Sequence, residues 1–376
     1  MEIAPFLLER YFAKYEFSAR YLLSSSDCEA VSMADLLAKA DREITILWEE
    51  LKLGYTESWG HPLLREAIAE LYTHLAAKDV LVIVPEEGIF LSMHALLKPG
   101  DHVICTYPGY QSLHEVARSI GCELSTWEPD EGRGWYFDIQ DLESLMREDT
   151  KLVVVNFPHN PTGYLTSRED FDALIEIVRS YGAYLFSDEM YRYLEVEEGT
   201  RLPAACDLYP LAYSLSGLSK SFGMPGLRIG WLATQDLEGL NQVSRLKDYT
   251  TICSSAPSEL LAIIALRNRS SVLEDQHARL LRNLNLLDTF FQDYQDFFRW
   301  NRPLGGSICF PRMTTVDDTY EFCERLVQDT GIMLAPSRAF QFGDRHVRIG
   351  FGRENMPVVL ERFESYLNQQ FRGSQI

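Results

Sequence analysis

The chain has 376 residues, and its 46% hydrophobic and 12% aromatic content is typical of a globular protein with a large core, which excludes an intrinsically disordered chain. At this length we expect two domains. Its 35 Lys and Arg residues against 55 Asp and Glu residues give a net charge of −20, which disfavours general binding to nucleic acids or to anionic membrane surfaces.

The first third of the chain alternates between helical and strand patterns. Residues 62–77 carry leucine and isoleucine at helical spacing, and Pro62 suits the first turn of a helix. The next four predicted elements are a strand, a helix, a strand and a helix, at 81–84, 86–97, 102–107 and 111–121.

The middle of the chain contains the clearest strand–helix–strand unit. Residues 151–156 (KLVVVN) form an apolar run rich in β-branched residues, which is typical of a strand buried on both faces. Thr166 and Glu169 have the spacing of a capping box and predict the start of an amphipathic helix, and residues 183–189 form the next buried strand. This alternation predicts a parallel or mixed sheet with crossover helices.

The last part of the chain has a different pattern of polar and apolar residues. From about residue 270 the pattern is that of long polar helices, and the last of them is predicted to begin at Pro357. We therefore expect an α/β fold with a large domain over 40–280 and a smaller α+β domain formed by both chain ends, 1–39 and 281–376.

The cysteines and the N-terminus bear on location and on metal binding. The seven cysteines are scattered without a C-x-x-C pair, and the eight histidines have no metal-ligand spacing, so we expect reduced thiols and no metal site. The N-terminal segment lacks the apolar core of a signal peptide, and no stretch approaches the roughly 18 apolar residues of a membrane span. These features predict a soluble cytoplasmic protein.

Three polar segments follow predicted elements at positions where a parallel sheet exposes functional groups. They are N-F-P-H-N-P-T-G at 156–163, S-D-E-M-Y at 187–191 and L-S-K-S-F-G-M-P-G-L-R-I-G at 218–230. Asp188 ends an apolar strand, where a carboxylate is costly unless a cation meets it. Lys220 is flanked by small residues and is followed eight positions later by Arg228.

In this order, N-x-P-x-N-P-T-G, D-x-x-Y and S-K-x-x-G-x-x-G-x-R resemble the motifs of the class I/II (aspartate aminotransferase-like, fold type I) enzymes that use pyridoxal 5′-phosphate (PLP). The resemblance runs from about Gly54 to Arg353. It implies a large α/β/α domain with a mixed, mostly parallel sheet beside the smaller α+β domain, PLP as cofactor, and a homodimer with composite active sites.

The resemblance implies catalytic roles for Lys220, Asp188 and Tyr191. Lys220 matches the Schiff-base lysine, whose amine also moves the substrate proton, and burial lowers the pKa of such an amine. Asp188 matches the aspartate that keeps the pyridine nitrogen protonated. Tyr191 and Asn160 match the pair that binds the 3′-oxygen of the cofactor. The alternatives are a surface lysine and a loop-capping aspartate.

Further matches concern the rest of the cofactor and the substrate. Tyr110 aligns with the aromatic residue that stacks on the pyridine ring, although a core aromatic is the simpler alternative. Arg228 matches the phosphate-binding arginine, with the Ser219 hydroxyl beside it. Arg348 matches the arginine that binds the substrate α-carboxylate, for which a planar guanidinium is suited. Tyr55 aligns with the tyrosine that reaches the phosphate of the neighbouring subunit.

Two departures from the family pattern concern the phosphate. Where relatives place backbone N–H groups at a helix start, this chain has Pro85, Glu86 and Glu87; proline has no N–H, and the carboxylates oppose a phosphate. The amides of the two glutamates can still contribute if their side chains point away. Gly217 stands where many relatives have a phosphate-binding serine, a role open to Ser216 or Ser219.

The substrate side chain is not readable from a motif, although relatives shape specificity around Trp59, Gly60 and residues 24–26. The resemblance implies an aminotransferase acting on an amino acid and a 2-oxo acid. A weaker resemblance, to the branch that contains capreomycidine synthase, implies a PLP-dependent lyase or cyclase acting by β-elimination on a polar amino acid. A third alternative, a ligand-binding module, is disfavoured by the complete set of matched residues.

Overall fold

The central strands are apolar along their whole length, as expected for strands that helices cover on both faces. In the computed structural model, which describes residues 2–372, seven strands form one sheet in the order β2-β8-β7-β6-β5-β3-β4. They are β2 (Val80–Ile83), β3 (His102–Thr106), β4 (Glu123–Trp127), β5 (Thr150–Asn156), β6 (Tyr184–Asp188), β7 (Ala212–Gly217) and β8 (Gly230–Ala233). β8 runs antiparallel to both of its neighbours, β2 and β7, and the other strand pairs of this sheet are parallel. The mixed, mostly parallel sheet is confirmed.

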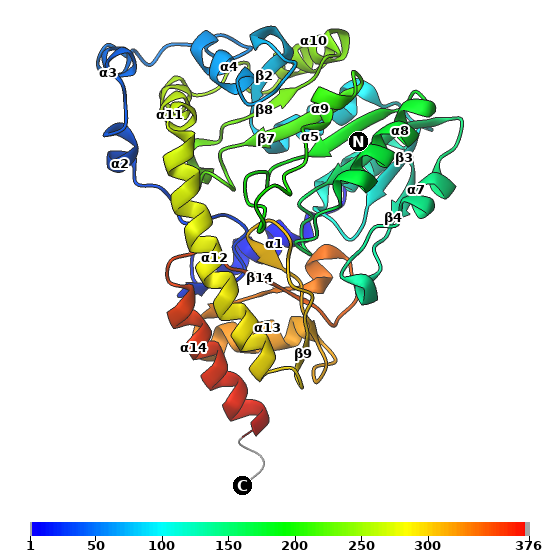
Figure 1. Ribbon diagram of the computed structural model, residues 1–376, viewed down its shortest axis with the longest axis vertical. Helices are drawn as coiled ribbons and strands as arrows, with labels where there is room; N and C mark the ends of the chain where they lie inside the picture. Colours follow the sequence, from blue (N-terminus) through cyan, green and yellow to red (C-terminus); the bar gives the residue numbers. More distant parts are fainter. Residues whose placement is uncertain (1, 373–376) are drawn as a thin grey trace.

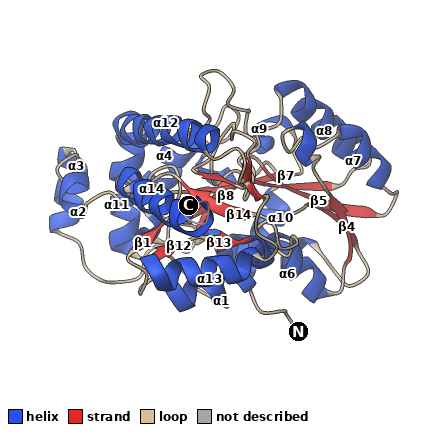
Figure 2. Cartoon of the chain, turned by 90° about the horizontal axis from the view of Figure 1, so that it is seen from below, coloured by secondary structure: helices blue, strands red, loops and turns tan. Residues whose placement is uncertain are grey.

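Alternate side chains of each strand enter different cores. Leu152 and Val154 of β5 pack with α5 (Pro85–Leu96), α6 (Ser112–Ile120) and α10 (Leu237–Lys247). Val153 and Val155 pack with α7 (Ile139–Leu145) and α8 (Arg168–Ser180) on the opposite face. Figure 2 shows the sheet between these two helix layers. The helices around the sheet are α4 (Pro62–Ala69), α5 (Pro85–Leu96), α6 (Ser112–Ile120), α7 (Ile139–Leu145), α8 (Arg168–Ser180), α9 (Ala205–Leu208), α10 (Leu237–Lys247) and α11 (Ala256–Arg267).

Two predicted helix boundaries differ from the structure. The helix expected over 62–77 ends at Ala69, because the backbone N–H groups of Thr73 and His74 donate to the Asp207 carboxylate and draw the chain out of helical geometry. The capping box expected from Thr166 is wrong by one residue. Ser167 is the N-cap of α8, and its hydroxyl accepts from the backbone N–H of Asp170.

A second core is built by both ends of the chain. Leu23 and Cys28 pack there with α12, α13 and α14, below the sheet in Figure 1. The helix α12 links the two cores, since Val272 belongs to the core beside the sheet and Leu280 to the second core. The elements outside the sheet region are α1 (Leu7–Tyr15), β1 (Tyr21–Leu22), α2 (Met33–Leu37), α3 (Arg42–Glu49), α12 (Arg269–Asp293), β9 (Phe298–Arg299), β10 (Ile308–Cys309), β11 (Arg312–Met313), α13 (Thr319–Thr330), β12 (Ile332–Met333), β13 (Ala335–Pro336), β14 (Val347–Gly350) and α14 (Met356–Leu367).

All seven cysteines are free thiols. Across residues 2–372, we find no helix that combines the length and the apolar character needed to cross a membrane.

Candidate active site

The carboxyl ends of β5, β6 and β7 open into a cavity of about 490 Å³. Its wall also includes the start of α5, the N-terminal segment and β14 of the second core. Nine of the residues assigned by the family motifs line it: Glu86, Tyr110, Asn160, Asp188, Tyr191, Ser219, Lys220, Arg228 and Arg348. Residues separated by almost 200 positions, such as Asn160 and Arg348, thus meet in one cavity.

Asp188 is the last residue of β6 and lies between β5 and β7, with 5% of its surface exposed. Its carboxylate accepts a hydrogen bond from the backbone N–H of Met190. Burial raises the pKa of Asp188 to about 7, and Lys220 only partly opposes this shift. A cationic ring nitrogen placed against this carboxylate would provide the counter-charge that the site lacks.

Lys220 follows β7 and turns its amine towards the N-terminal segment. Its Nζ donates to the Ser26 hydroxyl at 2.9 Å. Burial is the main cause that lowers the pKa of Lys220, and the Arg348 guanidinium lowers it further, while Asp27 and Asp188 act in the opposite direction. The lowered pKa increases the fraction of neutral amine, which is the nucleophilic form.

Arg348 is held in one orientation by its surroundings. Only 2% of its surface is exposed, and its guanidinium lies 5.6 Å from the ring centre of Phe12 and 5.2 Å from that of Phe340. Its Nε and Nη2 donate to the Ser24 carbonyl, and its Nη1 donates to Asn160 Oδ1 at 3.2 Å. These bonds leave one N–H on each Nη atom, which is the arrangement that binds a carboxylate bidentately.

The phosphate end of the expected cofactor has suitable donors. Arg228 is exposed towards the cavity, and the buried Ser219 hydroxyl has no hydrogen-bond partner within residues 2–372. A buried hydroxyl without a partner and a cation beside it suit an anionic ligand group. Tyr110 presents an aromatic ring in the same wall, supported by Phe6 at 5.0 Å between ring centres. The residues present therefore fit a phosphorylated aromatic aldehyde.

The two departures noted in the sequence form one packing unit. Pro85 is the first residue of α5, and its ring lies against Gly217 and Gly230 of the adjacent strands β7 and β8. A Cβ atom at Gly230 would lie 2.6 Å from Pro85 Cγ, and one at Gly217 would lie 3.2 Å from the same atom. A Cβ atom at Gly217 would also lie 3.0 Å from Gly230 Cα, so the neighbouring strand β8 and the Pro85 ring together leave little room for a serine at 217.

The two glutamates at the start of α5 face different surroundings. The Glu86 side chain lines the cavity, and burial raises its pKa. The Glu87 carboxylate instead accepts from the hydroxyl groups of Thr250 and Thr251, outside the cavity. The Glu87 side chain therefore points away from the cavity, as the interpretation of its backbone amide requires, whereas the Glu86 side chain does not.

Tyr55, Trp59 and Gly60 do not line the cavity of the single chain. Tyr55 is 90% exposed, and the Trp59 ring lies against the Arg65 guanidinium at 5.5 Å. Gly60 has φ +102°, and a Cβ atom there would lie 2.3 Å from the Val82 side chain, so its role in this chain is tight packing. The ligand-binding assignments of these residues stay predictions.

The N-terminal segment contributes residues that the motifs did not identify, among them Glu9, Glu16 and Asp27. This segment is held beside the cavity by the pairing of β1 with β12. It also packs closely against Gly350, where a Cβ atom would lie 1.9 Å from the Ser25 carbonyl oxygen. This glycine and Gly352, which packs against the backbone of Asp27 and Cys28, are sequence signals that could have indicated the close approach.

We expect Asp188 to make the cofactor-free protein less stable as the pH rises from about 4 to 7. In this range the unfolded carboxyl loses its proton while the buried one keeps it, so the unfolding free energy falls by up to about 4 kcal/mol. Thermal denaturation at several pH values should show this loss in the wild type and not in Asp188→Asn. The same pH dependence in both proteins would contradict the assignment.

Comparisons with known proteins agree with this geometry. The family model for aminotransferase class I and II matches residues 16–363. Capreomycidine synthase of Streptomyces vinaceus is 30% identical over 97% of this chain and 94% of its own, and an aspartate aminotransferase of Thermotoga maritima is 27% identical over 85% of each. A PLP-dependent aminotransferase of Streptococcus suis superposes with a TM-score of 0.92 at 29% identity, covering 98% of this chain and 99% of its own. The chain therefore belongs to the aminotransferase class I and II family and is a PLP-dependent enzyme of fold type I.

Proposed function

We propose that the protein transfers an α-amino group between an amino acid and a 2-oxo acid, with Lys220 as the nucleophile and proton carrier. The observation that carries this proposal is the presence, in one cavity, of a half-buried amine with lowered pKa and a guanidinium that keeps two N–H donors free of partners among residues 2–372. The first suits attack on an aldehyde, and the second suits the carboxylate that amino acids and 2-oxo acids share.

Each residue has a separate task in this proposal. Bound PLP supplies an electron sink for the substrate carbanion. When PLP is bound, Asp188 would hold the proton on the ring nitrogen, Tyr191 and Asn160 would bind the 3′-oxygen, and Arg228 and Ser219 would hold the phosphate. Arg348 binds the α-carboxylate, which presents the Cα–H bond to the Lys220 amine for proton transfer.

We also propose that the protein works in the cytoplasm as a homodimer. Three large hydrophobic side chains are almost fully exposed in the single chain: Tyr55 (90%), Leu53 (87%) and Tyr249 (90%). A second copy of the chain would cover them and would bring Tyr55 to the phosphate of the other cavity. The seven free thiols are in keeping with a reducing compartment.

Transfer of nitrogen is the decisive experiment for the reaction. The enzyme is incubated with PLP, a panel of ¹⁵N-labelled amino acids and a panel of 2-oxo acids, and the products are followed by mass spectrometry. The proposal expects labelled nitrogen in a new amino acid formed from the oxo acid. Labelled ammonia without such a product would favour a lyase instead.

A lyase or cyclase that acts on a polar amino acid is the second candidate. The carboxylates of Glu9, Glu16 and Asp27 line one side of the cavity, and Asp27 is already paired with Arg353 at 2.9 Å. Neither Glu9 nor Glu16 has an ion pair or a hydrogen bond to its side chain within residues 2–372. Burial raises the pKa of Glu16, and the like charges of Glu9 and Asp27 add to the shift. This wall favours a cationic over an anionic substrate side chain, whichever reaction follows.

Charge selectivity tests this wall. In Glu16→Gln we expect KM for donors with a cationic side chain to rise about fivefold, with little change for neutral donors, because one attraction of roughly 1 kcal/mol is removed. Glu49→Gln, at an exposed position of α3, is the matched control. An equal rise for both donor classes would contradict the assignment of the wall.

A further inference from the structure

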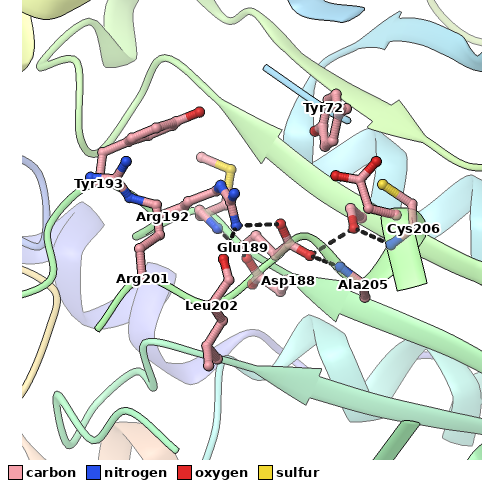
Figure 3. Close-up of polar contacts among 12 residues, drawn as sticks. Tyr72, Asp188, Glu189, Arg192, Tyr193, Arg201, Leu202, Ala205 and Cys206 are labelled. Atoms are coloured by element: carbon pink, nitrogen blue, oxygen red, sulfur yellow. Dashed lines mark hydrogen bonds and ion pairs between the residues drawn. The ribbon is translucent and has the colours of Figure 1, made fainter. Parts of the chain in front are cut away.

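The turn after β6 has two faces with different surroundings. Asp188 and Tyr191 line the cavity, whereas Glu189 and Arg192 lie on the other side, against residues 202–206. Figure 3 shows this second face, with Glu189 between Arg192 and Ala205. Glu189 is only 4% exposed, so its carboxyl group is buried. It directly follows Asp188, the proposed pyridine-binding aspartate, in the sequence.

The Glu189 carboxylate connects three separate segments. Its Oε1 accepts from the Ser214 hydroxyl at 2.6 Å and from the backbone N–H of Ala205 at 2.9 Å. The backbone N–H of Glu189 donates to the Leu215 carbonyl at 2.8 Å. Ser214 belongs to β7, the strand that leads to Lys220, so these bonds join the segment of Asp188 to the segment of Lys220.

Arg192 completes the arrangement. Its Nη1 lies 3.8 Å from Glu189 Oε2 and donates to the Leu202 carbonyl at 2.6 Å. The backbone N–H of Arg192 donates to the Glu189 carbonyl, which closes the turn that contains Tyr191. The pair thus holds the turn from the side that faces away from the cavity, without contact to the ligand space.

We propose that Glu189 is a positioning residue, which sets the distance and orientation of Asp188 and Tyr191 relative to Lys220 through its bonds to Ser214 and Ala205. The inference rests on the proposed roles of Asp188 and Lys220. If the Glu189 side chain is removed, the Ala205 N–H and the Arg192 guanidinium lose their buried partner, and the ends of β6 and β7 keep their backbone pairing but lose the side-chain contact that adds to it.

Two variants separate positioning from stability. Glu189→Ala removes the acceptor, whereas Glu189→Gln keeps an amide oxygen at nearly the same place. Tyr209→Phe is the matched control. It removes a buried hydrogen bond that the Tyr209 hydroxyl donates to the carbonyl of Ala183, the residue before the first residue of β6, at the strand end away from Asp188. The readouts are the equilibrium dissociation constant for PLP, the circular dichroism of the bound cofactor, which reports its orientation, and the melting temperature.

We expect Glu189→Ala to weaken PLP binding about tenfold and to change the cofactor dichroism, and Glu189→Gln to restore both. Tyr209→Phe should lower the melting temperature and leave the PLP affinity and the cofactor dichroism unchanged.

A Glu189→Ala protein that is less stable but has unchanged PLP affinity and cofactor dichroism would overturn the proposal. If it does not fold, Ser214→Ala replaces it, and an unchanged dichroism and affinity there would overturn the proposal as well. A wild-type protein that binds no PLP would instead refute the proposed function.

Discussion

Lys220→Ala is expected to lose at least about 10⁴-fold in kcat/KM and the visible absorbance of a Schiff base, while the protein stays folded. In the proposed function the lysine supplies both the nucleophilic amine and the group that moves the Cα proton, so one substitution would remove two functions. Its Nζ has a hydrogen bond to Ser26 as its one strong contact, and loss of this bond has little effect on stability.

Lys98→Ala is the matched control for this variant, since Lys98 is exposed at the end of α5 and far from the cavity wall. It should retain wild-type activity and absorbance. A Lys220→Ala enzyme that kept more than a small fraction of wild-type turnover would show that another amine carries the reaction.

Arg348→Lys is expected to lower kcat/KM by about 10³-fold for every amino acid and 2-oxo acid tested. The guanidinium is aligned by Ser24, Asn160 and two aromatic rings, and its remaining N–H donors form a planar fork. An ammonium group is a point charge with no such fork, and it would leave the Ser24 carbonyl and the Asn160 amide without their partner.

Arg345→Lys controls for the loss of an arginine in the same segment, because Arg345 pairs with Asp317 at the surface. It should have near-normal kinetics. A fall in kcat/KM that depended on the substrate side chain in Arg348→Lys would assign this arginine to the side chain rather than to the α-carboxylate.

The strands of the sheet and the polar segments after them were predictable because local rules are strong there. An apolar run such as residues 151–156 is typical of a strand in a sheet that helices cover on both faces. The parallel strands then bring Asn160, Asp188 and Lys220 to one edge of the sheet. The confirmed fold therefore depends on local patterns, each confined to one element or to the segment that follows it.

The parts that were missed depend on contacts distant in the sequence. The helix that ends at Ala69 is cut short by Asp207, a residue more than 130 positions away. The acidic wall comes from the N-terminal segment, which has no motif of its own: Glu9 lies in α1, Glu16 caps the end of this helix, and Asp27 lies beyond it. The close packing at Gly217 involves Pro85, which is distant in the sequence, as well as the neighbouring strand β8. No short window of sequence contains these pairs.

The central claim is that Lys220 forms the covalent link to PLP. The most direct measurement is to reduce the PLP-loaded wild-type enzyme with borohydride, digest it and locate the pyridoxyl adduct by mass spectrometry. The account predicts one adduct, on the peptide that contains Lys220, and none in Lys220→Ala. An adduct on a different lysine, or no adduct in a protein saturated with PLP, would contradict it.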